Sequence, residues 1–231
     1  MIKLHLRRLL TLSALLLLPL TRSWAMTPAT VRASDAVQVL KAIENIPDKA
    51  IPTDLLRRAH AIAVIPSLVI LGFVFGGRYG KGLISVKKAG GTWSDPGFIQ
   101  LVGGSVGFQI GVSSSDVVLV FATRRGVDSI VNGKFTLGVD AAVVTGPVGR
   151  NASASTDGKL HAEIYSYALA RGLFAGLSLK GGVISTDYAA NAAVYGAGIT
   201  PRRIFEGGVR NVPTSVLRFR KTLENYTSPS H

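Results

Sequence analysis

The sequence predicts an α+β fold: two amino-terminal helices, then a curled, barrel-like antiparallel β-sheet, with a short carboxy-terminal helix. Between positions 36 and 63, apolar residues recur at intervals of three and four, the spacing of a helix with one buried face. From position 68 onward Val, Ile, Phe and Gly dominate short runs. In 133–182 long side chains alternate with Gly, Ala and Ser, which is the period of a strand. Helices followed by a run of strands are typical of the α+β class.

Capping residues and prolines bound the two amino-terminal helices. Ser34 or Asp35 can cap the first, because a short polar side chain accepts a backbone hydrogen bond at a helix start, and Pro47 ends it. The second helix is expected to begin after Pro52 and to stop at Pro66. Its expected apolar stripe is Leu55, Leu56, Ala59, Ile62 and Ala63.

Short runs rich in β-branched and aromatic residues predict the strands. The expected strands are 69–75, 82–87, 98–102, 106–112 and 116–122, followed by the alternating tract 133–182. Ser113 to Asp116 is expected to be a turn. In the alternating tract, Phe135, Leu137 and Val139 fall on one face of a strand. Glycines inside strands permit tight curvature, which favours a curled sheet over a flat one.

Two helices are expected after the sheet. Tyr188 to Tyr195 is short and rich in alanine, and Pro213 to Tyr226 is amphipathic. The apolar stripe of the second can cover the sheet or lie in a lipid headgroup layer, and both interpretations stay open. The stripe is Val216, Phe219, Leu223 and Tyr226, whereas Arg218, Lys221 and Asn225 lie elsewhere on the helix.

The first 25 residues have the features of a secretory signal peptide. Three basic residues precede the apolar run 9–20, and Ser23-Trp24-Ala25 offers the small residues of a cleavage site. The apolar run is shorter than the roughly 20 residues that a membrane-spanning helix needs. The expected protein is therefore a bacterial-type, exported one, in the periplasm or peripheral on an envelope membrane. Residues 26–231 are expected to form a single domain.

The charge balance favours anionic partners. The chain has a formal net charge of +13, and residues 26–231 carry 22 basic against 13 acidic side chains. Nucleic acid is not the expected partner, because export and the missing recognition-helix and zinc patterns argue against it. The expected partner is anionic membrane lipid, because each basic residue near an anionic leaflet adds to the binding. The absence of cysteine excludes disulfides and thiolate sites. Aromatic residues, at 7%, are too few for the girdles of an outer-membrane pore.

One motif resembles a hydrolase site. Residues 103–107 match G-x-S-x-G, and Asp140 and His161 follow Ser105 in the order of a hydrolase triad. A nucleophile elbow leads from a strand into a helix, whereas 106–112 is expected to be a strand. Ser105 is therefore expected to be structural, and no catalytic residue is assigned.

The glycine-rich segment 76–82 invites a phosphate-binding interpretation, because clustered glycines free backbone amides for an anion. It is not a Walker motif, since Phe75 and Gly82 stand where glycine and Ser or Thr are required. A glycine-permitted β turn is the expected structure. Arg78 and Lys81 within it can still meet a lipid phosphate. The histidines of the mature chain are few and scattered, so no metal site and no cofactor are expected.

Several motifs in a fixed order resemble a known family. In chain order they are GGRYGKG (76–82), WSDP (93–96), GGSVGFQIG (103–111), GKFTLGVDA (133–141), GPVGR (146–150) and SYALARGLFAGLSL (166–179). Together they resemble the SYLF domain, also called the Ysc84-type domain, with its core at about 37–196 and a carboxy-terminal extension at 197–231. The resemblance implies a non-enzymatic domain. Eukaryotic members of that family bind phosphoinositides, in part through a basic segment near the start of the domain, and some bind actin.

What the resemblance implies for an exported protein is binding of anionic phospholipid at an envelope membrane surface. The matching basic segment is 49–66, although His60 replaces a frequent lysine and SYALARG (166–172) lacks family charges. The alternative is a periplasmic scaffold or interaction protein, whose curved apolar sheet binds another protein or an apolar ligand. The expected lipid-binding residues are Arg57, Arg58, Arg78, Lys81, Arg218 and Lys221.

Overall fold

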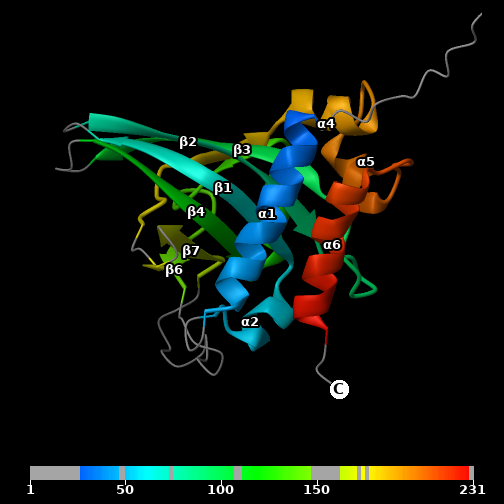
Figure 1. Cartoon of the computed structure of the whole chain (residues 1–231), viewed down its shortest axis with the longest axis horizontal. Coiled ribbons are helices and arrows are strands. Elements are labelled where there is room, and N and C mark those ends of the chain that lie inside the picture. The colour runs from blue at the N-terminus through cyan, green and yellow to red at the C-terminus, as the bar shows by residue number, and fades with distance from the viewer. Residues whose placement is uncertain are drawn as a thin grey trace, which may run out of the picture.

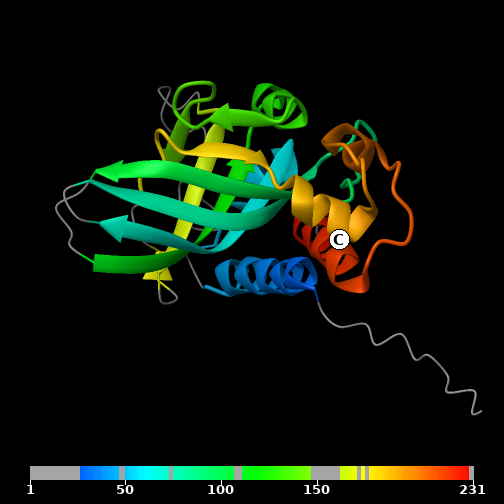
Figure 2. The ribbon, with the colours of Figure 1, turned by 90° about the horizontal axis from the view of Figure 1, so that it is seen from above.

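The computed structural model describes residues 27–46, 50–72, 75–106, 111–146, 162–170, 173–174 and 177–228. Within them the chain forms one continuous sheet with helices packed on both faces (Figure 1, Figure 2). The α+β class and the curled sheet expected from the sequence are confirmed. The expected signal peptide lies outside the described residues, as do Arg150, His161 and Arg171.

Four long strands form the centre of the sheet, and shorter strands extend it on both sides. The long ones are β1 (Ala61–Gly72), β2 (Phe75–Val86), β3 (Gly97–Val106) and β4 (Gly111–Phe121). The shorter ones are β5 (Lys134–Thr136), β6 (Val143–Thr145), β7 (Ile164–Ala170), β8 (Leu173–Phe174) and β9 (Val183–Thr186). Their order is β5-β9-β3-β2-β1-β4-β7-β6, and β8 pairs with β7 outside this path. All neighbours are antiparallel except β6 and β7, so the expectation of a purely antiparallel sheet is wrong for that pair.

Helices cover the two faces unequally. One face, called here the α1 face, packs against α1 (Pro28–Glu44), α2 (Thr53–Arg58), α4 (Tyr188–Tyr195) and α6 (Thr214–Thr227). The other, the α3 face, packs against α3 (Arg124–Val131) and α5 (Pro201–Glu206). Alternation along the strands separates the two cores, so that Ile62 and Val64 point to the α1 face and Ala63 and Ile65 to the α3 face. Figure 2 shows α1 and α3 on opposite sides of the sheet.

The first helix begins upstream of the expected start. α1 starts at Pro28 with Thr27 as its N-cap, and the hydroxyl of Thr27 accepts a hydrogen bond from the first turn. The predicted cap at Ser34 or Asp35 is wrong, because buried alanines upstream extend the apolar stripe. A capping hydroxyl followed by proline is a regular helix start.

The second expected helix is largely a strand. α2 ends at Arg58, and Ile62 and Ala63 belong to β1. β1 lies between β2 and β4, and residues 61–65 are buried on both faces of the sheet. Such a strand is a continuous apolar run, which periodicity cannot distinguish from a buried helix. The predicted stop at Pro66 is also wrong, because β1 continues through it.

A β-bulge in β1 accommodates that proline. β1 carries one residue more than β2 and one more than β4 between the flanking pairs. Ser67, in the bulge, has a φ of 51°, and its amide donates a hydrogen bond to Asp116 Oδ1 at 2.8 Å. The carboxylate of β4 thereby satisfies a backbone donor that the bulge takes out of the ladder.

The bulge also explains the glycines of the neighbouring strand. The predicted turn over 76–82 is wrong, because these residues lie within β2 and pair with β3 throughout. A Cβ built on Gly82 would lie 2.1 Å from the carbonyl oxygen of Val64, and one on Gly80 would lie 2.6 Å from Ile65 Cγ2. Only glycine lets β2 pass this close to β1.

Two other local expectations are wrong. Ser113 to Asp116 is not a turn but part of β4, where the three serines pair with β1. Val139 is 78% exposed rather than on the buried face, because β5 ends at Thr136 and the chain turns back so that Leu137 bridges Ala141. Short polar runs and alternation do not by themselves mark where a strand ends.

The helices expected after the sheet are confirmed as α4 and α6. The stripe of α6 covers the sheet: Val216 and Phe219 are fully buried and Leu223 is 1% exposed. α6 also packs along α1 and against α2. The helices α3 and α5 were not expected from the sequence.

Candidate functional site

Arg78, one of the expected lipid-binding residues, is buried, and its side chain hydrogen-bonds to neighbouring segments of the chain. Its guanidinium donates to Gly104 O, at 3.1 Å from Nε and 2.6 Å from Nη2, and also to Ser178 O and to Lys180 O, the last at 3.4 Å. The side chain points to the α3 face and the residue is 8% exposed. Burial lowers the pKa of Arg78 from its ordinary value. These contacts tie β2 to β3 and to residues 178–180 beneath the sheet.

Lys81 lies on the opposite face of β2 and is held by an acid. Its ammonium and the guanidinium of Arg32 each lie 3.1 Å from Asp187 Oδ2. Asp187 also caps α4, where its Oδ1 accepts from the amide of Ala190. Burial alone would raise the pKa of Asp187, but the Ala190 amide and the two cations outweigh it, so the pKa lies below its usual range. This cluster anchors α1 and α4 to the sheet.

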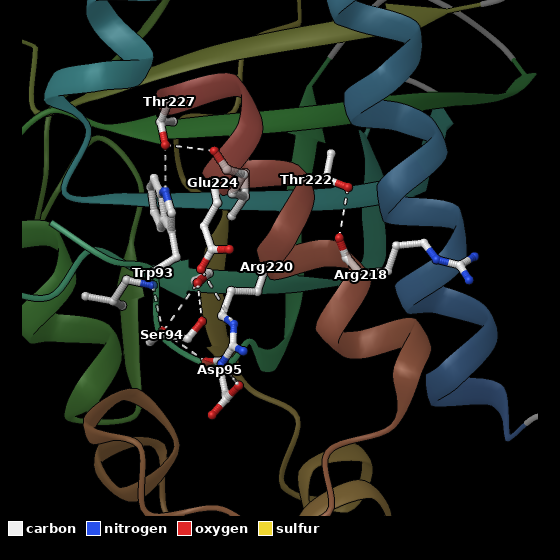
Figure 3. A network of polar contacts seen from close by, with 11 residues as sticks. Trp93, Ser94, Asp95, Arg218, Arg220, Thr222, Glu224 and Thr227 are labelled. Atoms are coloured by element: carbon white, nitrogen blue, oxygen red, sulfur yellow. Dashed lines mark hydrogen bonds and ion pairs between the residues drawn. The ribbon is translucent and has the colours of Figure 1, made fainter. Parts of the chain in front are cut away.

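Arg218 and Lys221 lie on the exposed side of α6. Between them, Arg220 points the other way and pairs with Asp95 at 2.6 Å (Figure 3). About two turns further, Thr227 accepts a hydrogen bond from Trp93 Nε1 at 2.8 Å. The turn before β3 therefore fixes α6 on its inner side, which leaves Arg218 and Lys221 at the surface.

Arg57 and Arg58 are exposed, and the sheet register brings other cations beside them. β1 begins directly after α2, and its first residue pairs with the last residues of β2 and β4. The backbone of His60 joins all three, since its amide donates to Phe121 O and its carbonyl accepts from Lys87 N, both at 2.8 Å. We call this region the basic end; it consists of Arg57, Arg58, Lys87, Lys88, Arg124 and Arg125.

The four cations that follow β2 or begin α3 were not identified from the sequence. They stand directly after strand ends, at Lys87-Lys88 and Arg124-Arg125, but only the register shows that these ends are adjacent. Lys87 is partly structural: its Nζ donates to Arg57 O at 2.6 Å and lies 5.1 Å from the centre of the Trp93 ring. Burial lowers its pKa.

Two acids partly balance the basic end. Asp54 pairs with Arg58 at 2.5 Å, both side chains being more than half exposed, and Glu163 lies 3.8 Å from Arg125. Exposed pairs of this kind contribute about 0–1 kcal/mol. The basic end therefore keeps an excess of positive charge that an anionic surface can meet.

The opposite end of the same four strands has a different character. On the α1 face, beyond the bulge, neighbouring strands present a contiguous group of exposed apolar side chains. Their exposed fractions run from 37% to 74%. Figure 2 shows that the strands project past α1 at this end. We call it the apolar end; it consists of Val69, Leu71, Tyr79, Val102 and Val112.

The hydrolase-like motif lies largely within β3 (Gly97–Val106), so the strand expected at 106–112 does not have those bounds. Ser105 lies near the end of β3, and the next described element is the strand β4 rather than a helix. Asp140 Oδ2 accepts from Thr136 N at 2.7 Å in the turn after β5. Among the described residues, no three acidic or histidine side chains gather to hold a metal, and no helix is long and apolar enough to cross a bilayer.

Known proteins are similar to this chain in sequence. A family model described as "Ysc84: Las17-binding protein actin regulator" matches residues 102–226. The chain belongs to the Ysc84 family. LAS seventeen-binding protein 3 of Saccharomyces cerevisiae is 36% identical over 176 residues, which are 75% of this chain and 38% of that protein. The SH3 domain-containing YSC84-like protein 1 of Xenopus laevis is 33% identical over 199 residues, 83% of this chain and 59% of that protein.

The Ysc84 match bears on the site in two ways. It describes a binding and regulatory protein rather than an enzyme. The matched segment contains α3, with its two cations, and all of α6 up to Tyr226. The chain spans 38% of the length of the first of these relatives and 59% of the second.

Proposed function

We propose that this Ysc84-family chain is a non-enzymatic module that binds anionic phospholipid, including phosphoinositide-like headgroups, through its basic end at an envelope membrane surface. The observation that carries the proposal is the convergence of three chain segments that each bring a pair of cations to one end of the sheet. Each Lys or Arg near an anionic leaflet contributes about 1 kcal/mol. Three to five such residues give salt-sensitive, reversible binding.

The cations expected from the sequence divide into two groups. Arg57 and Arg58 belong to the proposed membrane contact, and Arg218 and Lys221 offer a further basic surface on α6. Arg78 and Lys81 have protein partners at hydrogen-bonding distance, so we assign them to the fold.

Sedimentation with vesicles tests the proposal. In the variant Arg57→Gln/Lys88→Gln/Arg124→Gln, we expect binding to vesicles containing phosphatidylglycerol to weaken about a hundredfold at low salt, since three contacts of about 1 kcal/mol are lost. The matched control is Lys41→Gln/Lys134→Gln/Arg210→Gln, which removes the same charge from exposed positions elsewhere. Equal losses in both variants would show that net charge, not the basic end, governs binding.

Export is part of the proposal and has its own test. The basic start, the short apolar run and Ser23-Trp24-Ala25 support cleavage after Ala25. Amino-terminal sequencing of the exported protein is expected to begin at Met26. An intact amino terminus recovered from the membrane fraction would contradict it.

A second candidate function is docking of a partner protein, or of an apolar ligand, on the apolar end. The exposed apolar side chains there favour it, because contiguous apolar patches of this kind mark interaction surfaces. Relatives of this chain are described as Las17-binding, which is protein binding. If the protein fails to sediment with anionic vesicles but co-purifies with a partner that the variant Leu71→Ser/Val112→Ser loses, this second function is supported.

A further inference from the structure

A cleft of about 600 Å³ lies next to the basic end, between the end of β2, α3 and α5. Its size is that of small-molecule sites in proteins, which span roughly 300–1,000 Å³. Its floor is apolar: Val127 and Phe205 are almost fully buried, and Val131 continues the surface. The floor can therefore hold a hydrocarbon segment.

The rim of the cleft is cationic. Its lining cations are Lys87, Lys88, Arg124 and Arg202. The backbone carbonyl of Arg57 and the ring of Trp93 hold the ammonium of Lys87 in place. The ammonium of Lys88 reaches across to the carboxyl end of α5, since a Cβ built on Gly207 would lie 3.1 Å from its Nζ. Three segments of the chain thus bring positive charge to one opening.

Two acids also line the cleft. Asp128 is exposed on α3, and Glu206 lies 3.8 Å from Arg202 with both side chains about two-thirds exposed. Four cations against two anions leave the opening with a net charge of +2. An anion gains from this charge, and a ligand without charge does not.

We infer that this cleft binds one molecule of a phosphomonoester lipid, with the phosphate on the cationic rim and an acyl chain along the apolar floor. The inference rests on the proposed function, because it gives the membrane-binding module a single-lipid site beside its basic end. Free phosphate would use the rim alone and leave the floor exposed. A neutral acylglycerol would use the floor and leave the cations without an anion. The lipid satisfies both.

Calorimetric titration of the full chain with short-chain lysophosphatidic acids, below their micelle concentration, tests the inference. Each methylene placed on the floor strengthens binding by about fourfold at most, so the decanoyl lipid is expected to bind roughly tenfold more tightly than the octanoyl lipid. Inorganic phosphate and decanoylglycerol are expected to bind far more weakly than either. Affinity that does not depend on chain length, or phosphate that binds as tightly as the lipid, overturns the inference.

Two variants on one helix localise the site. Arg202→Gln is expected to weaken decanoyl lysophosphatidic acid about tenfold, because a charge-assisted hydrogen bond to the phosphate is lost. Arg203→Gln is the matched control, since Arg203 is the next residue of α5 and does not line this cleft. Asp128→Asn is expected to strengthen binding by removing a negative charge from the rim. Equal effects of the two arginine variants overturn the inference.

Vesicle sedimentation in parallel separates this inference from the function on which it rests. Binding to anionic vesicles without binding of the monomeric lipid overturns the cleft and leaves the membrane function standing. Binding of the monomeric lipid without binding to anionic vesicles overturns the membrane function and leaves the cleft as a lipid site. Arg57→Gln, which changes the basic end outside the cleft, is expected to affect the vesicles and not the monomeric lipid.

Discussion

The α1 face of the sheet has two halves that share strands but differ in what covers them. Under α1 and α6, Val64, Leu83 and Phe98 are fully buried. Farther along the same strands and on the same face, Tyr79 and Val102 remain 47% and 45% exposed. The alternation of apolar residues is the same in both halves. Alternation with a period of two residues therefore shows which side chains share a face of the sheet. Whether that face is core or surface depends on the helices packed against it.

The two ends of the strands also differ in charge. The sequence has no Asp, Glu, Lys or Arg in 61–77 or 97–115, which contain every residue of the apolar end except Tyr79, whereas cations gather where β1 starts and β2 and β4 end. One end suits phosphate and the other suits apolar surface. The two ends share no residue although they belong to one continuous sheet, so each end can be altered without the other.

Removing an apolar residue of α6 tests the covered half most severely. Phe219→Ala is expected to lower the free energy of unfolding by about 4 kcal/mol, because a fully buried ring is lost. Urea denaturation measures it. The control Lys221→Ala, on the exposed side of α6, should change stability by less than about 0.5 kcal/mol. A stable Phe219→Ala variant that loses vesicle binding would mean that α6 faces the membrane and does not cover the sheet.

Gly82 lies where the two halves join, and filling it is expected to strain the sheet. Gly82→Ala should cost about 3 kcal/mol or more, since the new Cβ would meet the backbone of Val64 rather than a movable side chain. Gly90→Ala is the control, because nothing lies within 4 Å of its added Cβ. Thermal melts of the two variants measure the difference, and equal melting temperatures would contradict the close approach of β1 and β2.

Asp187 pairs with Arg32 of α1 and Lys81 of β2 in the covered half of the α1 face. Asp187→Asn keeps a good helix cap but removes the charge that Arg32 and Lys81 meet, so we expect a loss of about 2 kcal/mol at neutral pH. Because the folded pKa is lowered, the parent holds this stabilisation above the unfolded value of about 3.9 and loses it as pH falls through the folded pKa. Denaturation between pH 5 and 2 should show the extra loss in the parent and not in the variant.

The smallest effect on stability is expected at the apolar end. Val112→Ser removes an apolar side chain that is 74% exposed, so the free energy of unfolding should change by less than about 0.5 kcal/mol. A large destabilisation would show that this half is covered after all. Calorimetry of the variant beside Phe219→Ala gives the contrast between surface and core on a single face.

How much the sequence could predict depended on whether each signal was local. α4 and α6 were found because their spacing and boundary residues lie within the helices themselves. The start of α1 was missed although Thr27-Pro28 carries a local signal, since Ser34 and Asp35 offered a stronger one nearer the large apolar residues. β1 was mistaken for helix because burial on both faces removes the period of two.

The candidate site could be predicted only in part, because it depends on register. Arg57 and Arg58 were found because the family resemblance points to a basic segment at 49–66, and they lie on a short helix within it. Lys88 and Arg124 join them through strand pairings that no spacing in the chain reveals. Arg78 was expected in a glycine-rich β turn, and the structure buries it because the glycines around it belong to a strand.

The extra residue in β1 reverses the phase of its alternation. Before the bulge, odd-numbered residues such as Ile65 point to the α3 face, and after it Val69 and Leu71 point to the α1 face. Deleting Ser67 would give β1 as many residues as β2 and β4 between the flanking pairs, so those pairs would be kept, with Val69 still on the α1 face and Ile70 on the α3 face. The inserted residue therefore shifts the numbering of the alternation without exchanging the two surfaces, and what its deletion would remove is the hydrogen bond from the Ser67 amide to Asp116.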